Sequence, residues 1–281
     1  MQITFKGNPL TLVGRSIQVG APAPDFKAAA LDLKEASLAD FKGTIKVLTS
    51  FPSLDTSVCD LQVKEFNKIT ASLSPEVHVI GISKDLPFAQ KRFCDEFTIN
   101  KVTLLSDYKT SSFGINYGLL IKELNLLARA VLIVDKNDVL RYVQVVKELT
   151  TPPDYKEAVQ KVQEVVKDPA HNVQGALPAH CTPCEGGVAP MPKERVAALR
   201  AKYLGWELVE EKKLVKEFKL TDFVEAKYLL DLVSVIAEEQ GHHPTLTLMY
   251  NKLRVTLTTH TAGGLTENDF IMAKIIDEVA S

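Results

Sequence analysis

The sequence predicts two domains of different architecture, an α/β layer fold followed by an α+β domain. The chain has 281 residues, more than one ordinary compact core requires. Its first part alternates strand-length apolar runs with helical stretches, whereas its last part places two pairs of strands between helices. Between them, segment 168–191 is rich in proline and glycine and has little periodic apolar signal. We therefore expect domains at 1–167 and 192–281, with 168–191 as an irregular linker.

In the first domain we expect a central sheet with helices on both faces. The buried-strand candidates are short runs rich in Val, Ile and Leu, at 45–51, 77–83, 130–135 and 140–146. The helical stretches lie at 58–73, 87–97, 110–117 and 154–166. Residues 1–7 alternate like one more short strand.

In the second domain the pattern predicts the order α-β-β-α-β-β-α, an antiparallel sheet with its helices on one face. The first helix is expected at 193–203, and the strands at 206–210, 213–218, 245–250 and 252–258. The long central helix has Thr221 as its expected N-cap and Gly241 at its C-terminal end. The last helix is expected to begin near Thr266.

Composition limits the classes of function. The chain is 46% hydrophobic and 24% charged with a net charge of −2, so no basic excess points to nucleic acid or to an anionic membrane. The longest apolar runs, such as 130–134, are too short to span a bilayer, and residues 1–7 do not resemble a secretory signal. We expect a cytoplasmic location, where four cysteines are more often catalytic, redox-active or metal-binding than structural.

The segment around Cys59 carries the first set of candidate residues. Cys59 falls in the first turn of a helix that follows a buried strand, where free amide N–H groups favour a thiolate. Thr56 can direct its hydroxyl at the sulfur or at a peroxide oxygen, and Pro52 can shield the pocket from water. A thiolate, such donors and a second thiol are what peroxide reduction needs. The residue types alone also fit a buried structural cysteine.

The pattern Pro-x-x-x-Thr-x-x-Cys at 52–59 is the active-site motif of the peroxiredoxins. Segments 51–56 and 85–94 resemble more specifically the thiol peroxidase branch, the atypical two-cysteine peroxiredoxins. Segment 126–130 resembles the part of that family that carries its active-site arginine. The resemblance extends over residues 4–166 and implies a thioredoxin-like fold.

By this resemblance Cys59 is the peroxidatic cysteine, and Pro52, Thr56 and Arg129 complete its pocket. The substrates would be hydrogen peroxide and organic hydroperoxides, and Arg129 would add a fixed positive charge and donate to the peroxide. Cys94 would be the resolving cysteine that closes an intramolecular disulfide, which thioredoxin or a similar dithiol would reopen. No bound cofactor is implied. We expect local unfolding of both cysteine-bearing helices during turnover.

Histidines form the second set of candidate residues. His242 and His243 lie where a helix gives way to a strand, and His260 lies on the polar face of the last strand or just past its end. Clustered imidazoles fit metal binding or acid–base chemistry, but also a solvated pair beyond a helix C-terminus. Adjacent histidines in an extended segment point to opposite sides, which argues against one zinc ion held by all three.

Segments 241–244, 250–252 and 259–270 resemble pterin-4a-carbinolamine dehydratase, and 181–187 and 205–206 resemble its bacterial members. That family dehydrates 4a-hydroxytetrahydropterin to quinonoid dihydropterin, a reaction that needs an acid and a base but no metal.

The resemblance assigns acid–base and substrate-binding roles to His242, His243 and His260, supported by Glu238 and Asp269. It also implies a homo-oligomer, at least a dimer. The alternative for this half is a dimerisation or binding module without catalysis, although that role would not need the three histidines and Asp269.

The pair Cys181-x-x-Cys184 lies in the linker and has several interpretations. It could be half of a zinc site, a redox dithiol or an inert feature of the dehydratase lead-in. As a dithiol it could reduce the Cys59–Cys94 disulfide as a built-in reductant.

Overall fold

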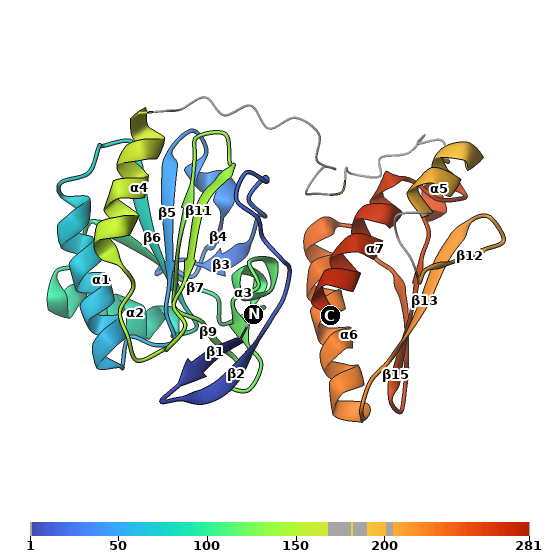
Figure 1. Cartoon of the computed structure of the whole chain (residues 1–281), viewed down its shortest axis with the longest axis horizontal. Coiled ribbons are helices and arrows are strands. Elements are labelled where there is room, and N and C mark those ends of the chain that lie inside the picture. Colours follow the sequence, from blue (N-terminus) through green and yellow to red (C-terminus); the bar gives the residue numbers. More distant parts are fainter. Residues whose placement is uncertain (1, 168–180, 182–189, 201–204, 281) are drawn as a thin grey trace. The chain divides into compact units, whose positions relative to one another are not determined.

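The computed structural model describes residues 2–167, 181, 190–200 and 205–280. The chain divides into two compact units, Met1–Ala176 and Leu177–Ser281 (Figure 1). Most of the expected linker, including Cys184, lies outside the described residues.

The first unit is built on a seven-stranded mixed sheet in the order β11-β10-β5-β6-β7-β3-β4. Strands β5, β6 and β7 run parallel to one another, and the other neighbours pair antiparallel. The strands are β3 (Lys27–Ala29), β4 (Glu35–Ser37), β5 (Ile45–Ser50), β6 (Val77–Ser83), β7 (Val102–Ser106), β10 (Ala130–Val134) and β11 (Leu140–Val145). The helices are η1 (Leu38–Phe41), α1 (Ser57–Thr70), α2 (Pro87–Phe97), α3 (Ser112–Asn116) and α4 (Tyr155–Lys167).

The sheet has a hydrophobic core on each face, because successive side chains of a strand point to opposite sides. On β10, Leu132 joins one core, while Val131 and Ile133 join the other. Helices α1, α2 and α4 contribute to the second core, for example through Val63 and Val162. The expected arrangement of helices on both faces is therefore confirmed, since α3 contributes to the first core.

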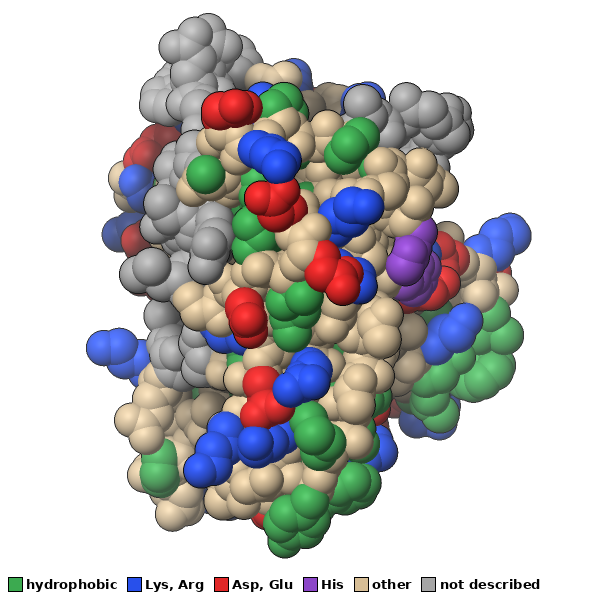
Figure 2. Space-filling model, turned by 90° about the vertical axis from the view of Figure 1, so that its right-hand side faces the viewer, with side chains coloured by type: hydrophobic (Ala, Val, Ile, Leu, Met, Phe, Trp, Pro, Cys, Tyr) green, Lys and Arg blue, Asp and Glu red, His purple; other side chains and the backbone are tan. Residues whose placement is uncertain are grey.

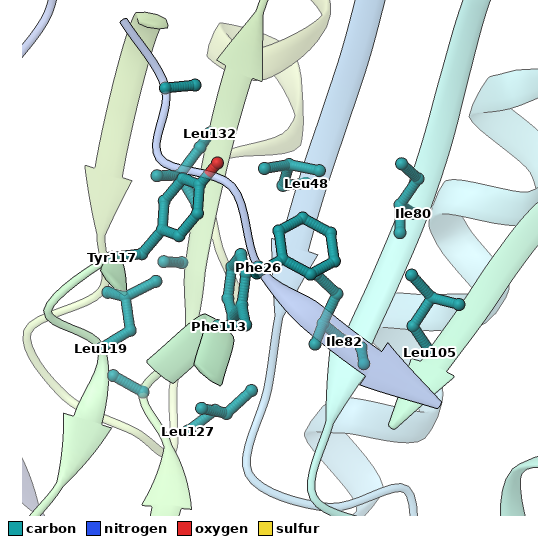
Figure 3. Packing of buried hydrophobic residues seen from close by; sticks show 14 of the residues in the cluster. Phe26, Leu48, Ile80, Ile82, Leu105, Phe113, Tyr117, Leu119, Leu127 and Leu132 are labelled. Atoms are coloured by element: carbon teal, nitrogen blue, oxygen red, sulfur yellow. The ribbon is translucent and has the colours of Figure 1, made fainter. Parts of the chain in front are cut away.

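An aromatic group lies at the centre of the first core. Phe26 meets Phe113 edge-on, with ring centroids 5.4 Å apart, and Phe113 stacks on Tyr117 at 4.6 Å (Figure 3). The Tyr117 hydroxyl donates to the carbonyl of Pro24 at 2.7 Å, so its polar end is satisfied inside the core. Burial raises the pKa of Tyr117 well above its ordinary value.

A second, smaller sheet of this unit joins residues far apart in the sequence, in the order β1-β2-β8-β9. Its strands are β1 (Gln2–Phe5), β2 (Asn8–Val13), β8 (Leu120–Ile121) and β9 (Leu126–Leu127). The Glu148 carboxylate accepts hydrogen bonds from the backbone N–H groups of Lys6 and Gly7 at 3.0 and 3.1 Å. The β1–β2 hairpin is thereby tied to the segment that follows β11.

The four predicted buried strands of this unit are confirmed, with ends that differ by at most one residue, and the short strand expected within residues 1–7 is β1. Strand β7 was not predicted, although it lies inside the sheet between β6 and β3. Strands β2, β3, β4, β8 and β9 were also missed. The predicted helix at 110–117 is shorter and comprises α3 alone.

The second unit has the predicted order of helices and strands. Its elements are α5 (Lys193–Arg200), β12 (Glu207–Val209), β13 (Lys213–Lys219), α6 (Phe223–Gln240), β14 (Thr245–Met249), β15 (Lys252–Leu257), η2 (His260–Ala262) and α7 (Glu267–Val279). All neighbours in the sheet β12-β13-β15-β14 pair antiparallel. On β15, Leu253, Val255 and Leu257 are buried, and α6 and α7 cover this one face (Figure 1). The remainder of the helix predicted at 193–203 lies outside the described residues.

The ends of α6 follow the local sequence signals with one correction. The N-cap is Asp222 and not Thr221, because the carboxylate of Asp222 accepts the N–H of Glu225 at 2.9 Å. At the other end Gly241 adopts a left-handed conformation with φ of 59°, as expected of a C-terminal glycine. The backbone reverses direction there and leads directly into the two adjacent histidines.

Trp206 lies in the core of the second unit. Its side chain is 3% exposed, and its indole N–H points to both carboxylate oxygens of Asp277 at 3.1 Å. Lys216 donates to the same carboxylate at 2.8 Å. The aromatic side chain therefore connects the start of β12 with α7 near the C-terminus.

Acidic and basic side chains are interspersed on the face of the molecule shown in Figure 2. This mixture agrees with the net charge of −2. Among the described residues, no helix combines the length and the hydrophobicity that crossing a bilayer requires.

Candidate active sites

The chain between β5 and α1 places Cys59 in the first turn of α1. Thr56 is the N-cap, with extended backbone (φ −109°, ψ 139°), and Cys59 is the third residue of the helix. Pro52 is buried in the loop that follows β5. The side chain of Cys59 is fully buried. The first turn of α1 thus places the sulfur in the interior of the unit.

Two donors converge on the sulfur of Cys59. The Thr56 hydroxyl donates to it at 2.8 Å, and Nη2 of Arg129 donates at 3.4 Å. Arg129 comes from the start region of β10 and is only 1% exposed. Donors of this kind suit a negatively charged acceptor, and a guanidinium brings its positive charge close to the sulfur. The structure therefore brings together Thr56, Cys59 and Arg129, whereas for Pro52 it gives burial in the loop between β5 and α1.

Gln62, which sequence reasoning missed, fixes the orientation of Arg129. Its side-chain oxygen accepts a hydrogen bond from Nη1 of Arg129, and its amide nitrogen donates to the Thr49 hydroxyl at 2.7 Å. Nη2 and Nε of Arg129 also donate to the Leu149 carbonyl, at 2.9 and 3.3 Å. One signal could have found Gln62: it lies three residues after Cys59 and therefore on the same face of α1.

Cys94 lies on α2 and is half-buried. Burial raises the pKa of its thiol above the ordinary value, and the neighbouring Asp95 carboxylate raises it further. Helices α1 and α2 are in contact, because Nζ of Lys64 lies 3.3 Å from the ring centroid of Phe97. Cys59 and Cys94 are both free thiols. A disulfide has an S–S length of about 2.05 Å, so at least one of the two cysteines must move before the bond can form.

His242 and Asp269 form a buried pair in the second unit. Nε2 of His242 lies 2.8 Å from Oδ1 of Asp269, and the two residues are 6% and 0% exposed. His242 follows the C-cap of α6, and Asp269 lies in the first turn of α7. Asp269 and the N-cap Thr266 form a capping box, in which the Thr266 N–H donates to Oδ2 of Asp269 at 2.8 Å.

Asp269 also connects His242 with the segment that carries His260. The Thr259 hydroxyl donates to Oδ2 of Asp269 at 2.9 Å, and His260 follows directly as the first residue of η2. The side chain of His260 is exposed. The carboxylate therefore holds the two histidine-bearing segments in fixed positions relative to α7.

His243 has a different environment from its neighbour. It is exposed, and its Nε2 lies 3.0 Å from Oε2 of Glu238, which is exposed as well. The opposite environments of His242 and His243 agree with the expectation for adjacent residues in an extended segment. The structure thus pairs His242 with Asp269 and His243 with Glu238.

Cys181 lies against the helix ends that frame the histidine site. Its N–H donates to Oε1 of Gln240 at 2.9 Å, and its sulfur lies 3.7 Å from the carbonyl of Asn268. Cys184 is outside the described residues, so the geometry of the Cys-x-x-Cys pair is not part of the structure. Within the described ranges, no group of three or more His, Cys, Asp or Glu side chains is arranged to hold a metal ion.

Comparisons with known proteins assign the two units to two different families. Residues 18–159 match the Redoxin family, and residues 189–279 match the family Pterin 4 alpha carbinolamine dehydratase. A thiol peroxidase of Bacillus subtilis (strain 168) is 46% identical over 166 residues, which is 59% of this chain and 99% of the relative. A thiol peroxidase of Halalkalibacterium halodurans is 47% identical over 158 residues, 56% of this chain and 95% of the relative.

Solved structures match the first unit. A peroxiredoxin-like protein from Aquifex aeolicus superimposes with a TM-score of 0.56 at 44% identity, covering 58% of this chain and 96% of that one. A thiol peroxidase from Chromobacterium violaceum has a TM-score of 0.54 at 20% identity, covering 59% of this chain and 98% of that one. The second of these shows the fold alone.

Proposed function

The chain belongs to the redoxin family and joins a thiol peroxidase to a pterin-4a-carbinolamine dehydratase domain; from this we propose that it reduces hydroperoxides at Cys59 and dehydrates a 4a-hydroxytetrahydropterin at His242. The observation that carries the first assignment is the pair of donors on the buried sulfur of Cys59. The buried His242–Asp269 pair carries the second.

The peroxidase reaction begins with attack of the Cys59 thiolate on one oxygen of the hydroperoxide. The O–O bond breaks, Cys59 becomes a sulfenic acid, and the other oxygen leaves as water or an alcohol after taking up a proton. Thr56 and Arg129 can donate hydrogen bonds to the peroxide oxygens as negative charge moves from the sulfur to the leaving oxygen. Gln62 contributes indirectly by holding Arg129 in place.

In the second step the Cys94 thiolate attacks the sulfenic sulfur, hydroxide leaves as water, and the Cys59–Cys94 disulfide forms. Thioredoxin or a similar dithiol then reduces the disulfide by exchange and is itself oxidised. This cycle needs a steady supply of reduced dithiol, which supports a cytoplasmic location.

The dehydratase reaction removes the hydroxyl of C4a as water and a proton from a ring nitrogen, giving the quinonoid dihydropterin. One group must protonate the leaving hydroxyl and another must take the nitrogen proton, and imidazoles suit both tasks near neutral pH. His242 is held by Asp269, whereas His243 and His260 are exposed and can reach a bound pterin. Glu238 supports His243 through its contact at 3.0 Å.

The competing function for this half is a binding module without catalysis. Taking an ionisable pair out of water costs free energy, and docking alone would not need the imidazole of His242 beside Asp269. We also propose that the chain assembles at least as a homodimer, in analogy with its two families.

The experiment measures dehydration of synthetic 4a-hydroxytetrahydropterin by the full chain and by two variants. His242→Ala removes the buried imidazole, and the matched control His78→Ala removes an exposed histidine on β6 of the first unit. We expect dehydration to collapse in His242→Ala and to remain in His78→Ala, with peroxide reduction intact in both. Background dehydration by the parent, with peroxidase activity present, would refute the dehydratase assignment and leave a binding module.

A further inference from the structure

The carboxylate of Asp85 holds the loop that precedes Cys59. Its Oδ1 accepts a hydrogen bond from the Ser53 hydroxyl at 2.6 Å, and its Oδ2 accepts the N–H of Leu54 at 2.8 Å. These two residues lie between β5 and the N-cap of α1. Asp85 itself follows β6, so it connects the ends of two adjacent parallel strands.

The same carboxylate is connected to the helix that carries Cys94. Oδ2 of Asp85 also accepts the Ser83 hydroxyl at 2.8 Å, and this hydroxyl oxygen accepts the side-chain amide of Gln90 at 3.1 Å. Gln90 is fully buried on α2, one turn before Cys94, and donates as well to the Leu105 carbonyl at 3.0 Å. A continuous hydrogen-bonded chain therefore runs from the loop before Cys59 to the helix of Cys94.

Disulfide formation requires at least one of the two cysteines to move, and we expect this movement to open the Asp85 network. Cys59 is fully buried at the start of α1, and both cysteines are free thiols on separate helices. The network attaches to the segments at which both helices begin, because Leu54 precedes α1 and Asp85 precedes α2. Contacts that hold these segments raise the free energy of local opening, and they therefore favour the folded arrangement over the opened one.

We propose that Asp85 is a positioning residue that holds both cysteine-bearing helices in the peroxide-reactive arrangement and thereby limits the rate at which Cys94 reaches oxidised Cys59. This inference rests on the proposed peroxidase function. It has a chemical consequence for the sulfenic acid. While the network is closed, a second hydroperoxide can oxidise the sulfenic acid to sulfinic acid, releasing a second water or alcohol. Once it opens, Cys94 forms the disulfide and water leaves.

The test uses Asp85→Asn, which keeps the size of the side chain but removes its charge and one acceptor oxygen. The reduced full chain is mixed rapidly with hydrogen peroxide, quenched with acid, alkylated and analysed by mass spectrometry for the thiol, sulfinic acid and disulfide forms of Cys59. The substitution weakens hydrogen bonds to a charged acceptor, so the two helices should open more readily. We therefore expect disulfide formation to accelerate about tenfold. The yield of sulfinic acid at a given peroxide concentration should fall in proportion.

Asp40→Asn is the matched control. Asp40 also accepts a serine hydroxyl and a backbone N–H, both from Ser37 at η1, but it lies outside the network. The rate of disulfide formation in Asp40→Asn should equal that of the parent. Ser53→Ala removes one donor to Asp85 and provides a milder variant should Asp85→Asn not fold. In the double variant the effects of Ser53→Ala and Asp85→Asn should not add, because both act on one contact.

An unchanged or slower disulfide step in folded Asp85→Asn and Ser53→Ala would overturn the role of Asp85. So would an equal acceleration in Asp40→Asn. Failure of the proposed function has a different signature, since Cys59 of the parent would then not be oxidised by peroxide at all.

Discussion

Nη2 of Arg129 lies 3.4 Å from the sulfur of Cys59, and neither side chain is exposed by more than 1%. The five N–H groups of a guanidinium lie in one plane and point in fixed directions. The plane must therefore be oriented correctly for one of them to point at the sulfur. Gln62 and the Leu149 carbonyl fix that orientation from the opposite edges. The geometry of the sulfur pocket therefore depends on residues that do not touch the sulfur.

Replacement of Gln62 by leucine should slow the reaction of Cys59 with peroxide at least about tenfold, since loss of a hydrogen bond to a charged group leaves Arg129 less well positioned. The second-order rate of Cys59 oxidation, measured by rapid quench, checks this. Gln160→Leu is the control, because Gln160 is an exposed glutamine on α4. Equal rates in Gln62→Leu and the parent would contradict the role of Gln62.

Thr56→Val should reduce the same rate about tenfold or more, because it removes the hydroxyl that donates to the sulfur at 2.8 Å. Thr56→Ser keeps the hydroxyl and should retain most of the rate. The contrast between these two variants separates the hydrogen bond from the packing of the side chain. Similar losses in both would show that the hydroxyl is not the active feature.

Asp269→Asn should lower both the dehydration rate and the stability of the second unit. The fully buried carboxylate accepts from Thr259 and from Thr266 and contacts His242, and an amide cannot accept all these bonds. We expect about 1–3 kcal/mol of destabilisation in urea unfolding and a loss of dehydration of about a hundredfold. Asp231→Asn on the exposed side of α6 is the control. A stable but inactive Asp269→Asn would assign the residue to chemistry alone.

Alkylation of Cys94 should increase with pH beyond the range of an ordinary thiol. Burial, and then Asp95, raise the pKa of Cys94, so the midpoint of its ionisation lies at a higher pH than that of an ordinary thiol. Iodoacetamide labelling of reduced Cys59→Ser, resolved by peptide mass, measures this profile. Asp95→Asn should shift the profile to lower pH. A plateau below pH 8 in Cys59→Ser would contradict the prediction.

Acid should weaken the attachment of the N-terminal hairpin. Hydrogen bonds from the hydroxyls of Thr150 and then Thr4 lower the pKa of Glu148 to about 2. Because the folded pKa lies below the unfolded value of about 4.3, the stabilisation is complete above that value and is lost as the pH falls towards 2. The thermal unfolding midpoint of the parent should therefore decline more steeply across this interval than that of Glu148→Gln. Parallel declines would show that Glu148 does not contribute.

Sequence patterns predicted the strands whose own residues form a continuous apolar run. The apolar runs of β5, β6 and β10 are buried on both faces and have no other stable use in a soluble domain. Strand β7 was missed because its five residues include the exposed Thr103 and give too short a signal. The two-residue strands β8 and β9 are too short to give a pattern of their own, and β8 is held in its sheet by pairing with the distant β2.

For the sites, motifs identified the candidate residues of each segment, Asp269 and Glu238 included, but not Gln62 or the role of Asp85. Thr56 and Cys59 belong to one short segment, and its spacing is distinctive. Helical spacing places Gln62 on the same face of α1 as Cys59, but its contact with Arg129 arises only in the fold. The sequence places Asp85 only within the family segment 85–94. Its hydrogen-bond partners Ser53 and Leu54 follow a different strand, so no local pattern reveals the contact.

Trp206 is the sole tryptophan of the chain, and it is buried in the second unit against Asp277. Tryptophan fluorescence therefore reports on the dehydratase domain alone, while circular dichroism records the backbone of both domains. Denaturation followed by the two signals would coincide if the domains unfold together and separate if they unfold independently. The natural sequence thus already carries a spectroscopic label for one of its two domains.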